Sequence, residues 1–310
     1  MLRILQSRGA NEIRRRAFAT SASAVEEPVT RRGSCTVPVA FTKFDAKEDA
    51  APSPPVVLLH GLLGSQMSYR SLVKKPEFAP KRDIYTLDMR NHGLSPHTGE
   101  MDLHALSRDV SLFLDNEGIE AASIVGTNIG GKVGMILALE QSDRVSDLVV
   151  IDGSPLASDK KLEFVNKIVQ VIHDVEIENY TQKKDIEEDL KKGGIEDDRL
   201  RQFLMTNVVS DSDEPGFYKW RHGIQAIQEA MPALITFPVY ESETYTGKSL
   251  FAFGKQWSEE EEAAIKKLFP NAAMKNLEST GPYFSGPNFP AIGSTEKLTE
   301  VLNEHLGSKP

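Results

Sequence analysis

The chain has 310 residues, of which 40% are apolar and 26% charged, so it is long and apolar enough to bury one large core or two small ones. No long internal repeat recurs, and no apolar run reaches the roughly 18 residues of a membrane helix, which excludes a repeat protein and stable membrane insertion. A net charge of −9 argues against nucleic acid as a partner, because its phosphates would be repelled.

Residues 1–23 hold five arginines and one acid and end in small hydroxylated residues. This composition is typical of a mitochondrial transit peptide, which is basic to follow the membrane potential and amphipathic to bind import receptors. It predicts location in the mitochondrion, in the matrix, and cleavage near Phe18 or a few residues later, and it leaves a charge of −13 on the rest of the chain. A frayed basic N-terminus is the alternative. The arginines at 14–16 interrupt any apolar core and argue against a secretory signal.

The next part of the chain, residues 36–156, alternates between short apolar runs and amphipathic helices. Residues 36–44 alternate like a half-buried strand, and the continuous apolar run at 56–59 is typical of a strand buried on both faces. Further strands are predicted at 84–87, 123–125 and 148–151, and helices at 103–114 and 133–139. This β-α-β-α order predicts a parallel sheet with helices on both faces.

Residues 157–238 do not continue this alternation of strands and helices. They are mostly helical in pattern, and they contain no strand run of comparable quality. One apolar stripe is formed by Leu162, Val165, Ile168, Val169 and Ile172. An insertion of this kind between two strands predicts a helical cap over the carboxyl edge of the sheet. The α/β pattern returns over residues 239–307, with strands near 249–254 and 274–277 and helices beginning near 259 and 295.

Four glycine-containing loops follow four of the predicted strands. Their sequences are HGLLG at 60–64, DMRNHGLS at 88–95, GTNIGG at 126–131 and IDGSP at 151–155. The glycines of the first loop allow a sharp turn that points backbone N–H groups at a ligand, which is how half of an oxyanion hole is built. The third loop has the spacing of the nucleophile elbow G-x-S-x-G. Each motif alone is weak, but their common order supports a single fold.

On these motifs, together with RQFLMTN and WRHGIQAI in the cap segment, the chain resembles the α/β-hydrolase domain-containing protein 11 family of mitochondrial ester hydrolases and its bacterial esterase relatives. The resemblance covers the chain from about Val37 to His305. It implies an α/β-hydrolase fold, with a mostly parallel sheet flanked by helices and a helical cap insertion. It also implies acyl-ester cleavage by a serine at the elbow, a histidine before the last helix and an aspartate.

The chain departs from the family at the position of the nucleophile, which is Asn128. The lone pair of an amide nitrogen is delocalised into the carbonyl, so a neighbouring base cannot activate it as it activates serine. Asparagine tolerates the positive φ of an elbow residue, so the turn itself is expected to survive. The resemblance places the oxyanion hole and pocket at four residues, His60, Gly61, Leu62 and Ile129.

The position of the histidine is also changed. In the family it follows the final strand, and here Pro282 stands there, which can neither donate nor accept a proton. A cap histidine such as His222 could swing in as a base, but a hydrogen-bonded structural role is favoured. Asp152 is retained at the acid position, although without a histidine it has nothing to orient, and residues 255–257 at the other common acid position contain no acid.

The sequence therefore favours a mitochondrial pseudohydrolase that binds a small acyl or ester-like ligand, or a protein partner, without cleaving it. The alternative is an active carboxylic ester hydrolase in which Asp152 and Asn128 position a water molecule. No cofactor is expected, because neither a dinucleotide-binding GxGxxG motif nor a P-loop occurs. No metal site is expected either, since Cys35 is the only cysteine and the acids at 259–262 are typical of a solvated helix start. The single cysteine also indicates a reducing compartment.

Overall fold

The structure is a computed structural model that describes residues 35–47, 53–156, 159–254, 257–277 and 295–307. Its centre is a seven-stranded sheet with the order β1-β3-β2-β4-β5-β8-β9. The strands are β1 (Phe41–Phe44), β2 (Val56–Leu59), β3 (Ile84–Leu87), β4 (Ala122–Thr127), β5 (Val145–Ile151), β8 (Lys248–Phe253) and β9 (Ala273–Asn276). Every neighbouring pair is parallel except β1 and β3. The mostly parallel sheet expected from the sequence is confirmed, and the expected transit peptide lies outside the described residues.

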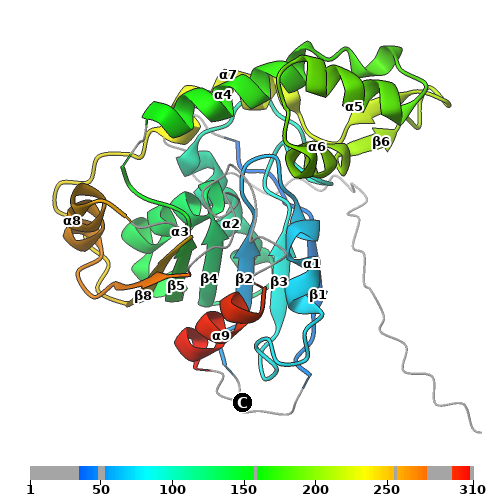
Figure 1. Ribbon diagram of the computed structural model, residues 1–310. Coiled ribbons are helices and arrows are strands. Elements are labelled where there is room, and N and C mark those ends of the chain that lie inside the picture. The colour runs from blue at the N-terminus through cyan, green and yellow to red at the C-terminus, as the bar shows by residue number, and fades with distance from the viewer. Residues whose placement is uncertain (1–34, 48–52, 157–158, 255–256, 278–294, 308–310) are drawn as a thin grey trace, which may run out of the picture.

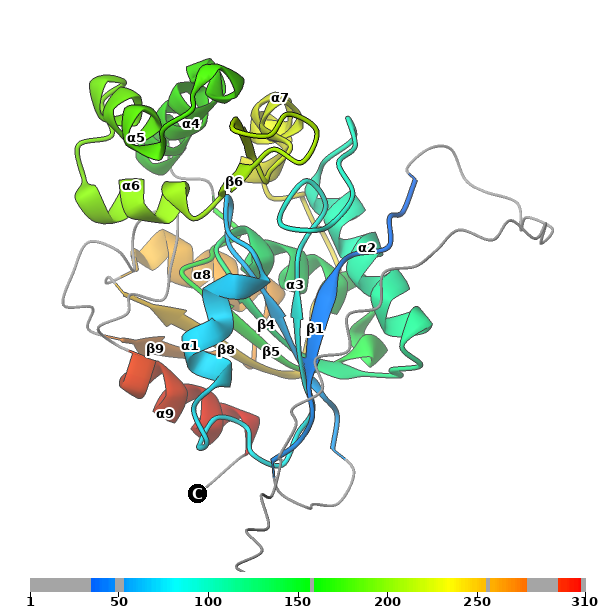
Figure 2. The ribbon, with the colours of Figure 1, turned by 90° about the vertical axis from the view of Figure 1, so that its right-hand side faces the viewer.

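Helices cover both faces of the sheet (Figure 2). On one face lie α1 (Arg70–Val73) and α9 (Thr295–Leu306), and on the other lie α2 (Leu103–Asn116), α3 (Ile129–Glu140) and α8 (Glu259–Leu268). Alternation along β2 assigns side chains to the two layers, because successive residues of a strand point to opposite faces. Val56 and Leu58 join the cluster with α1 and α9, whereas Val57 and Leu59 join the cluster with α2 and α3. The short 3-10 turn η1 (Gln66–Tyr69) leads into α1, and η2 (Ser142–Arg144) connects α3 to β5.

Strand β1 is shorter than the range 36–44 expected from alternation. The Val37 N–H donates to Asp109 Oδ1 at 2.8 Å, and the Ala40 N–H donates to Ser95 Oγ, also at 2.8 Å. These backbone donors are satisfied by side chains, so strand pairing with β3 begins only at Phe41. Alternating burial alone does not distinguish such an extended lead-in from a strand.

The chain between β5 and β8 forms a cap over the carboxyl edge of the sheet (Figure 1). It contains α4 (Asp159–Asp174), η3 (Ile177–Asn179), α5 (Lys183–Lys192), α6 (Asp198–Met205), β6 (Val208–Ser210), β7 (Tyr218–Trp220) and α7 (Ile224–Ile235). The antiparallel pair β6–β7 was not expected, because strands of three residues are too short to show a periodic pattern. The domain boundaries at 156 and 238 stay a prediction. No helix in the described ranges is long and apolar enough to cross a membrane.

Candidate functional site

Four loops meet at the carboxyl edge of the sheet, directly beneath the cap. Each contains one non-glycine residue in the left-handed region of φ: Leu63 at 58°, Asn91 at 61°, Asn128 at 52° and Asp152 at 51°. These residues follow β2, β3, β4 and β5, which are neighbouring strands. Positive φ costs free energy for a residue with a Cβ, and such strain is concentrated at functional sites. Of the five non-glycine residues with positive φ in the described ranges, four therefore lie at the sheet edge predicted from the sequence motifs, and the fifth, Ala79, precedes β3.

The elbow between β4 and α3 depends on close backbone contacts. Asn128 has φ 52° and ψ −111°, and its N–H donates to the Ile151 carbonyl of the neighbouring loop at 2.8 Å. A Cβ on Gly126 would lie 2.2 Å from the Gly130 carbonyl oxygen, and one on Gly130 would lie 2.3 Å from the Leu59 carbonyl oxygen. Only glycine fits at these two positions. The sharp turn is thus kept although its central residue is not serine.

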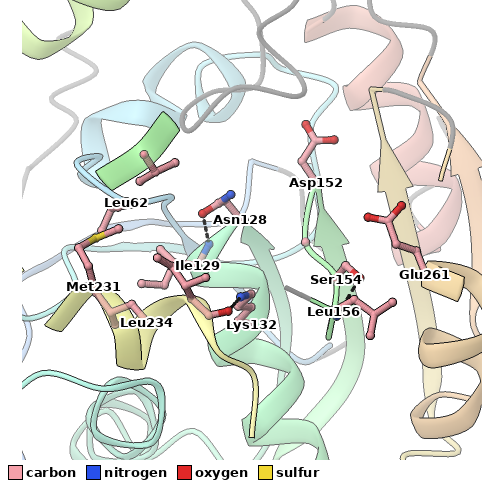
Figure 3. Close-up of a pocket in the computed structure, with 13 residues that line it drawn as sticks. Leu62, Asn128, Ile129, Lys132, Asp152, Ser154, Leu156, Met231, Leu234 and Glu261 are labelled. Carbon is pink, nitrogen blue, oxygen red and sulfur yellow. Dashed lines mark hydrogen bonds between the residues drawn. The ribbon is translucent and has the colours of Figure 1, made fainter. Parts of the chain in front are cut away.

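The Asn128 side chain forms a hydrogen bond within its own turn. Its Oδ1 accepts the N–H of Ile129, the first residue of α3, at 2.8 Å (Figure 3). The N–H after the central elbow residue is one of the two donors from which an oxyanion hole of this type is built. In this protein, that donor already has an acceptor from its own chain.

The loop after β2 supplies the second backbone donor. Leu62 lines the pocket described below, and its N–H has no hydrogen-bond partner among the described residues. The turn is closed by a 3.0 Å bond from the Gly64 N–H to the Gly61 carbonyl. The expected pair of donors, Leu62 and Ile129, is therefore brought to one site, with one donor open and the other occupied.

Three buried histidines stack beneath these loops. The ring centroids of His60 and His92 are 5.0 Å apart, and those of His92 and His222 are 4.9 Å apart. One nitrogen of each ring accepts a backbone N–H, from Met89, Leu63 and Gly93 in turn, at 3.0, 3.1 and 3.3 Å. The other nitrogen of each ring donates to a backbone carbonyl at 2.8 or 2.9 Å. Each ring is therefore held as one neutral tautomer, with both nitrogens engaged.

This stack joins the cap to the loop after β2. The Leu63 carbonyl accepts bonds of 2.9 Å from His222 Nε2 and from Asn207 Nδ2, both of which belong to the cap. Burial lowers the pKa of His60 and His92 to about 3, and it lowers the pKa of His222 well below 6.5. His222 thus has the hydrogen-bonded structural role that the sequence favoured.

Two expected pocket residues lie elsewhere. The His60 ring has no exposed surface and is turned toward the Met89 N–H, so it does not line the pocket. Gly61 does not line it either, since its carbonyl accepts from His60 Nδ1 and from the Gly64 N–H within the turn. These two residues shape the turn that presents Leu62.

Asp152 lies at the end of β5 with 6% of its surface exposed. Its N–H donates to the Ala252 carbonyl, and its Oδ1 accepts the Gly254 N–H, both at 2.9 Å. The aspartate therefore ties the ends of β5 and β8 together while it lines the pocket. Pro282, which the resemblance places at the position of the family's histidine, lies outside the described residues.

The pocket lies between the elbow and α7 and has a volume of about 80 Å³ (Figure 3). It is lined by Leu62, Asn128, Ile129, Lys132, Asp152, Gly153, Ser154, Leu156, Val165, Met231, Leu234, Ile235 and Glu261. Met231 and Leu234 form an apolar wall on the side opposite Asp152 and Glu261. In the described part of the chain, no group of three or more His, Cys, Asp or Glu side chains could hold a metal ion.

Lys132 is a pocket residue that the sequence analysis missed. It follows Asn128 by four positions, and its N–H donates to the Asn128 carbonyl, so it stands one helical turn below the elbow. Its Nζ donates to the Ile235 carbonyl at the end of α7, which connects the elbow helix to the cap. The spacing of four on a helix that begins at the elbow was the signal that could have found it.

Comparisons with known proteins agree with this architecture. Residues 54–173 match the model of the alpha/beta hydrolase fold family. The sn-1-specific diacylglycerol lipase ABHD11 of Xenopus tropicalis is 34% identical over 244 residues, which cover 77% of this chain and 75% of the relative. The protein of the same name from Mus musculus is 30% identical over 283 residues, which cover 88% of this chain and 89% of the relative.

A solved structure gives the same result. A marine microorganism esterase superposes with a TM-score of 0.71 and 25% sequence identity, covering 78% of this chain and 91% of the esterase. Fold, elbow geometry and sequence similarity over most of both chains agree with one another. The chain belongs to the α/β-hydrolase domain-containing protein 11 family of α/β-hydrolase-fold proteins.

Proposed function

We propose that this chain is a non-hydrolysing member of its family that binds an acyl ligand in the pocket beneath the cap. The observation that carries the proposal is Asn128 at the elbow, with its side-chain oxygen on the Ile129 N–H. An amide nitrogen is not a nucleophile, and the amide oxygen occupies a donor that would otherwise stabilise a tetrahedral oxyanion. Attack and transition-state stabilisation are both weakened by this one residue.

The distribution of histidines supports the proposal. All seven lie in the described ranges, and none lines the pocket. Three form the buried stack; the others are His97 beside the Arg221 carbonyl, His104 beside Glu140, His173 beside Gln225, and His305 near the end of α9. A general base must lie within hydrogen-bond reach of the proton that it takes. Without a nucleophile and base acting together, only roughly 10³ to 10⁴-fold acceleration over water remains from binding and oxyanion stabilisation.

The proposal is tested by treating the purified protein with a fluorophosphonate probe and with aryl esters. We expect neither labelling nor turnover above the buffer rate, and the same result for Asn128→Ala. Labelling or turnover that the substitution abolishes would show that the site is a working hydrolase. The double variant Asn128→Ser with Pro282→His should gain esterase activity if the rest of the pocket is intact.

A second function, ester hydrolysis by a water molecule held between Asp152 and Asn128, is favoured by two observations. Both side chains line the same pocket, and relatives that cover most of the chain are named as diacylglycerol lipases. In that case turnover of an ester would be lost in Asp152→Asn as well as in Asn128→Ala, whereas fluorophosphonate labelling would be absent from the start.

We propose the mitochondrial matrix as the location, on the basis of the basic, hydroxyl-rich composition of residues 1–23. Import into isolated mitochondria should depend on the membrane potential and should shorten the chain near Phe18. N-terminal sequencing that finds Met1 on the imported protein would reject this proposal.

A further inference from the structure

One short segment of the cap, residues 221–223, is bonded to two loops of the core, and we call it the latch. His222 Nε2 donates to the Leu63 carbonyl in the loop after β2 at 2.9 Å. The Gly223 N–H donates to the Asn91 carbonyl in the loop after β3, also at 2.9 Å. A Cβ on Gly223 would lie 3.0 Å from Asn91 Oδ1, so the latch packs closely against this second loop.

The two core residues that the latch bonds, Leu63 and Asn91, both have positive φ, at 58° and 61°. This conformation costs free energy in a residue with a Cβ, and it persists only where surrounding contacts hold it. At Leu63 two of these contacts come from the cap, because the carbonyl accepts from His222 Nε2 and from Asn207 Nδ2. The Arg221 N–H donates to the Asn207 carbonyl at 2.8 Å, so the two donors are joined to each other within the cap.

The bonds to Leu63 also affect the pocket, because Leu63 directly follows Leu62, which carries the open N–H. A change of φ at Leu63 rotates the peptide group that joins it to Leu62. The bond from the Gly64 N–H to the Gly61 carbonyl, which closes this turn, would change with it. The direction of the Leu62 N–H therefore depends on bonds that the cap supplies.

The latch also fixes one wall of the pocket. Helix α7 begins at Ile224, directly after the latch, and its residues Met231 and Leu234 line the pocket on the side of Leu62 (Figure 3). The far end of α7 is held by the bond from Lys132 Nζ to the Ile235 carbonyl. One segment of the cap thus positions both the apolar wall and the turn that carries the open donor.

We propose that His222 and Asn207 are positioning residues that hold the Leu62–Leu63 turn in its strained form, so that the pocket is complete only while the latch is attached. A ligand that accepts the Leu62 N–H then also strengthens the attachment of the cap, and a change that loosens the cap weakens binding, since coupling between two sites is reciprocal. This proposal goes beyond the proposed function and does not depend on it, because the bonds of the latch are the same whether or not a bound molecule is cleaved.

Amide hydrogen exchange of the ¹⁵N-labelled full chain, followed by NMR, tests the latch. His222→Asn keeps an acceptor near the place of Nδ1 for the Gly93 N–H, but it is too short to reach the Leu63 carbonyl. The Leu63 and Gly64 amides should then exchange about fivefold to tenfold faster, as the loss of one hydrogen bond predicts, and the Leu62 amide signal should shift. His222→Gln keeps a donor at the place of Nε2 and should restore near wild-type exchange at both amides.

A second variant and a control complete the test. Asn207→Leu removes the other donor to the Leu63 carbonyl with little change in volume, so it should also accelerate exchange at Leu63 and Gly64. It decides the question alone if His222→Asn does not fold. His173→Asn is the matched control, because His173 lies in the cap but bonds to Gln225 of the same cap, and it should leave both amides unchanged.

The amides of Val125 in β4 and Val149 in β5 report the stability of the whole sheet, and they should exchange as in the wild type. Wild-type exchange at Leu63 and Gly64 in both His222→Asn and Asn207→Leu would overturn the proposal. Equal acceleration at the turn and at the two strand valines would also overturn it, because the protein would then have lost stability throughout. No ligand enters these measurements, so their outcome leaves the proposed function unaffected.

Discussion

The His92 ring makes the stability of the protein depend on pH in a way that one substitution can isolate. His92 is fully buried and neutral, with Nε2 accepting the Leu63 N–H and Nδ1 donating to the Arg90 carbonyl. Burial lowers its pKa to about 3, with a further contribution from the neighbouring ring of His60. A proton on Nε2 would face the Leu63 N–H, so the folded state resists protonation.

The magnitude follows from the difference in proton binding between the two states. The unfolded chain takes up a proton at His92 near its ordinary pKa of 6.5, whereas the folded chain does so only near 3. Between these values the unfolded state binds more protons, so the free energy of unfolding falls as the pH falls, and the contribution is fully present only above about 6.5. From pH 7 to pH 5 this one ring costs roughly 2 kcal/mol.

The substitution His92→Gln removes this term and keeps the bond, because the glutamine amide oxygen reaches the place of Nε2 and does not titrate. Urea unfolding between pH 7 and pH 5 should show a loss that is about 2 kcal/mol smaller in His92→Gln than in the wild type. His92→Asn is the matched control: it also removes the titration, but its shorter side chain leaves the Leu63 N–H unpaired, so it should be less stable at pH 7. Equal losses in His92→Gln and in the wild type would refute the reasoning, since His92 would then not be held neutral.

Three further substitutions test the framework of the site by urea unfolding at pH 7. Gly126→Ala should lower the free energy of unfolding by at least about 3 kcal/mol, because the new Cβ would lie 2.2 Å from the Gly130 carbonyl oxygen. Gly99→Ala is the control and should change it by less than about 0.5 kcal/mol, because the space around its Cβ is open. Asp109→Asn breaks a buried ion pair in which Arg90 Nε lies 2.6 Å from Asp109 Oδ2, and it should lower the free energy of unfolding by about 3 to 5 kcal/mol. Asp115→Asn, in the more exposed pair with Arg144, should lower it by less than about 1 kcal/mol. Asp152→Ala leaves the Gly254 N–H without its acceptor and should cost about 1 to 3 kcal/mol, while Asp152→Asn keeps an acceptor and should cost less; equal costs would contradict this bond.

Much of the fold could be predicted from apolar runs and turn residues. The strands at 56–59 and 84–87 have the expected bounds, since buried apolar runs closed by turn residues leave little freedom of register, and the last helix begins at residue 295 as expected. The strand expected at 36–44 was too long, because the amides of Val37 and Ala40 bond to side chains brought from Asp109 and Ser95. Such hydrogen-bond partners cannot be predicted from the local sequence pattern, because they lie far apart along the chain.

The candidate site also has some features that could be predicted from the sequence and others that could not. Asn128 was found from the spacing of the elbow motif, and Asp152, Leu62 and Ile129 were expected from the family resemblance; the structure brings all four to one pocket. The bond from the Ile129 N–H to Asn128 Oδ1 could not be predicted, since it depends on the rotamer that the asparagine adopts at positive φ. The histidine stack could not be predicted either, because its rings come from three segments separated by up to 162 positions in the sequence.

The motif residues that remain have structural bonds that do not depend on catalysis. Asp152 ties β5 to β8 through the Gly254 N–H, and Gly126 and Gly130 allow the close approach of β4, α3 and β2. The resemblance predicts that the serine and the histidine, which carry the chemistry in the family, are replaced here by Asn128 and Pro282. Asn128 also satisfies the turn that it occupies, because it tolerates positive φ and caps the first N–H of α3. The turn can therefore keep its shape without a serine, because the bonds that hold it come from Asn128 itself and from the glycines around it.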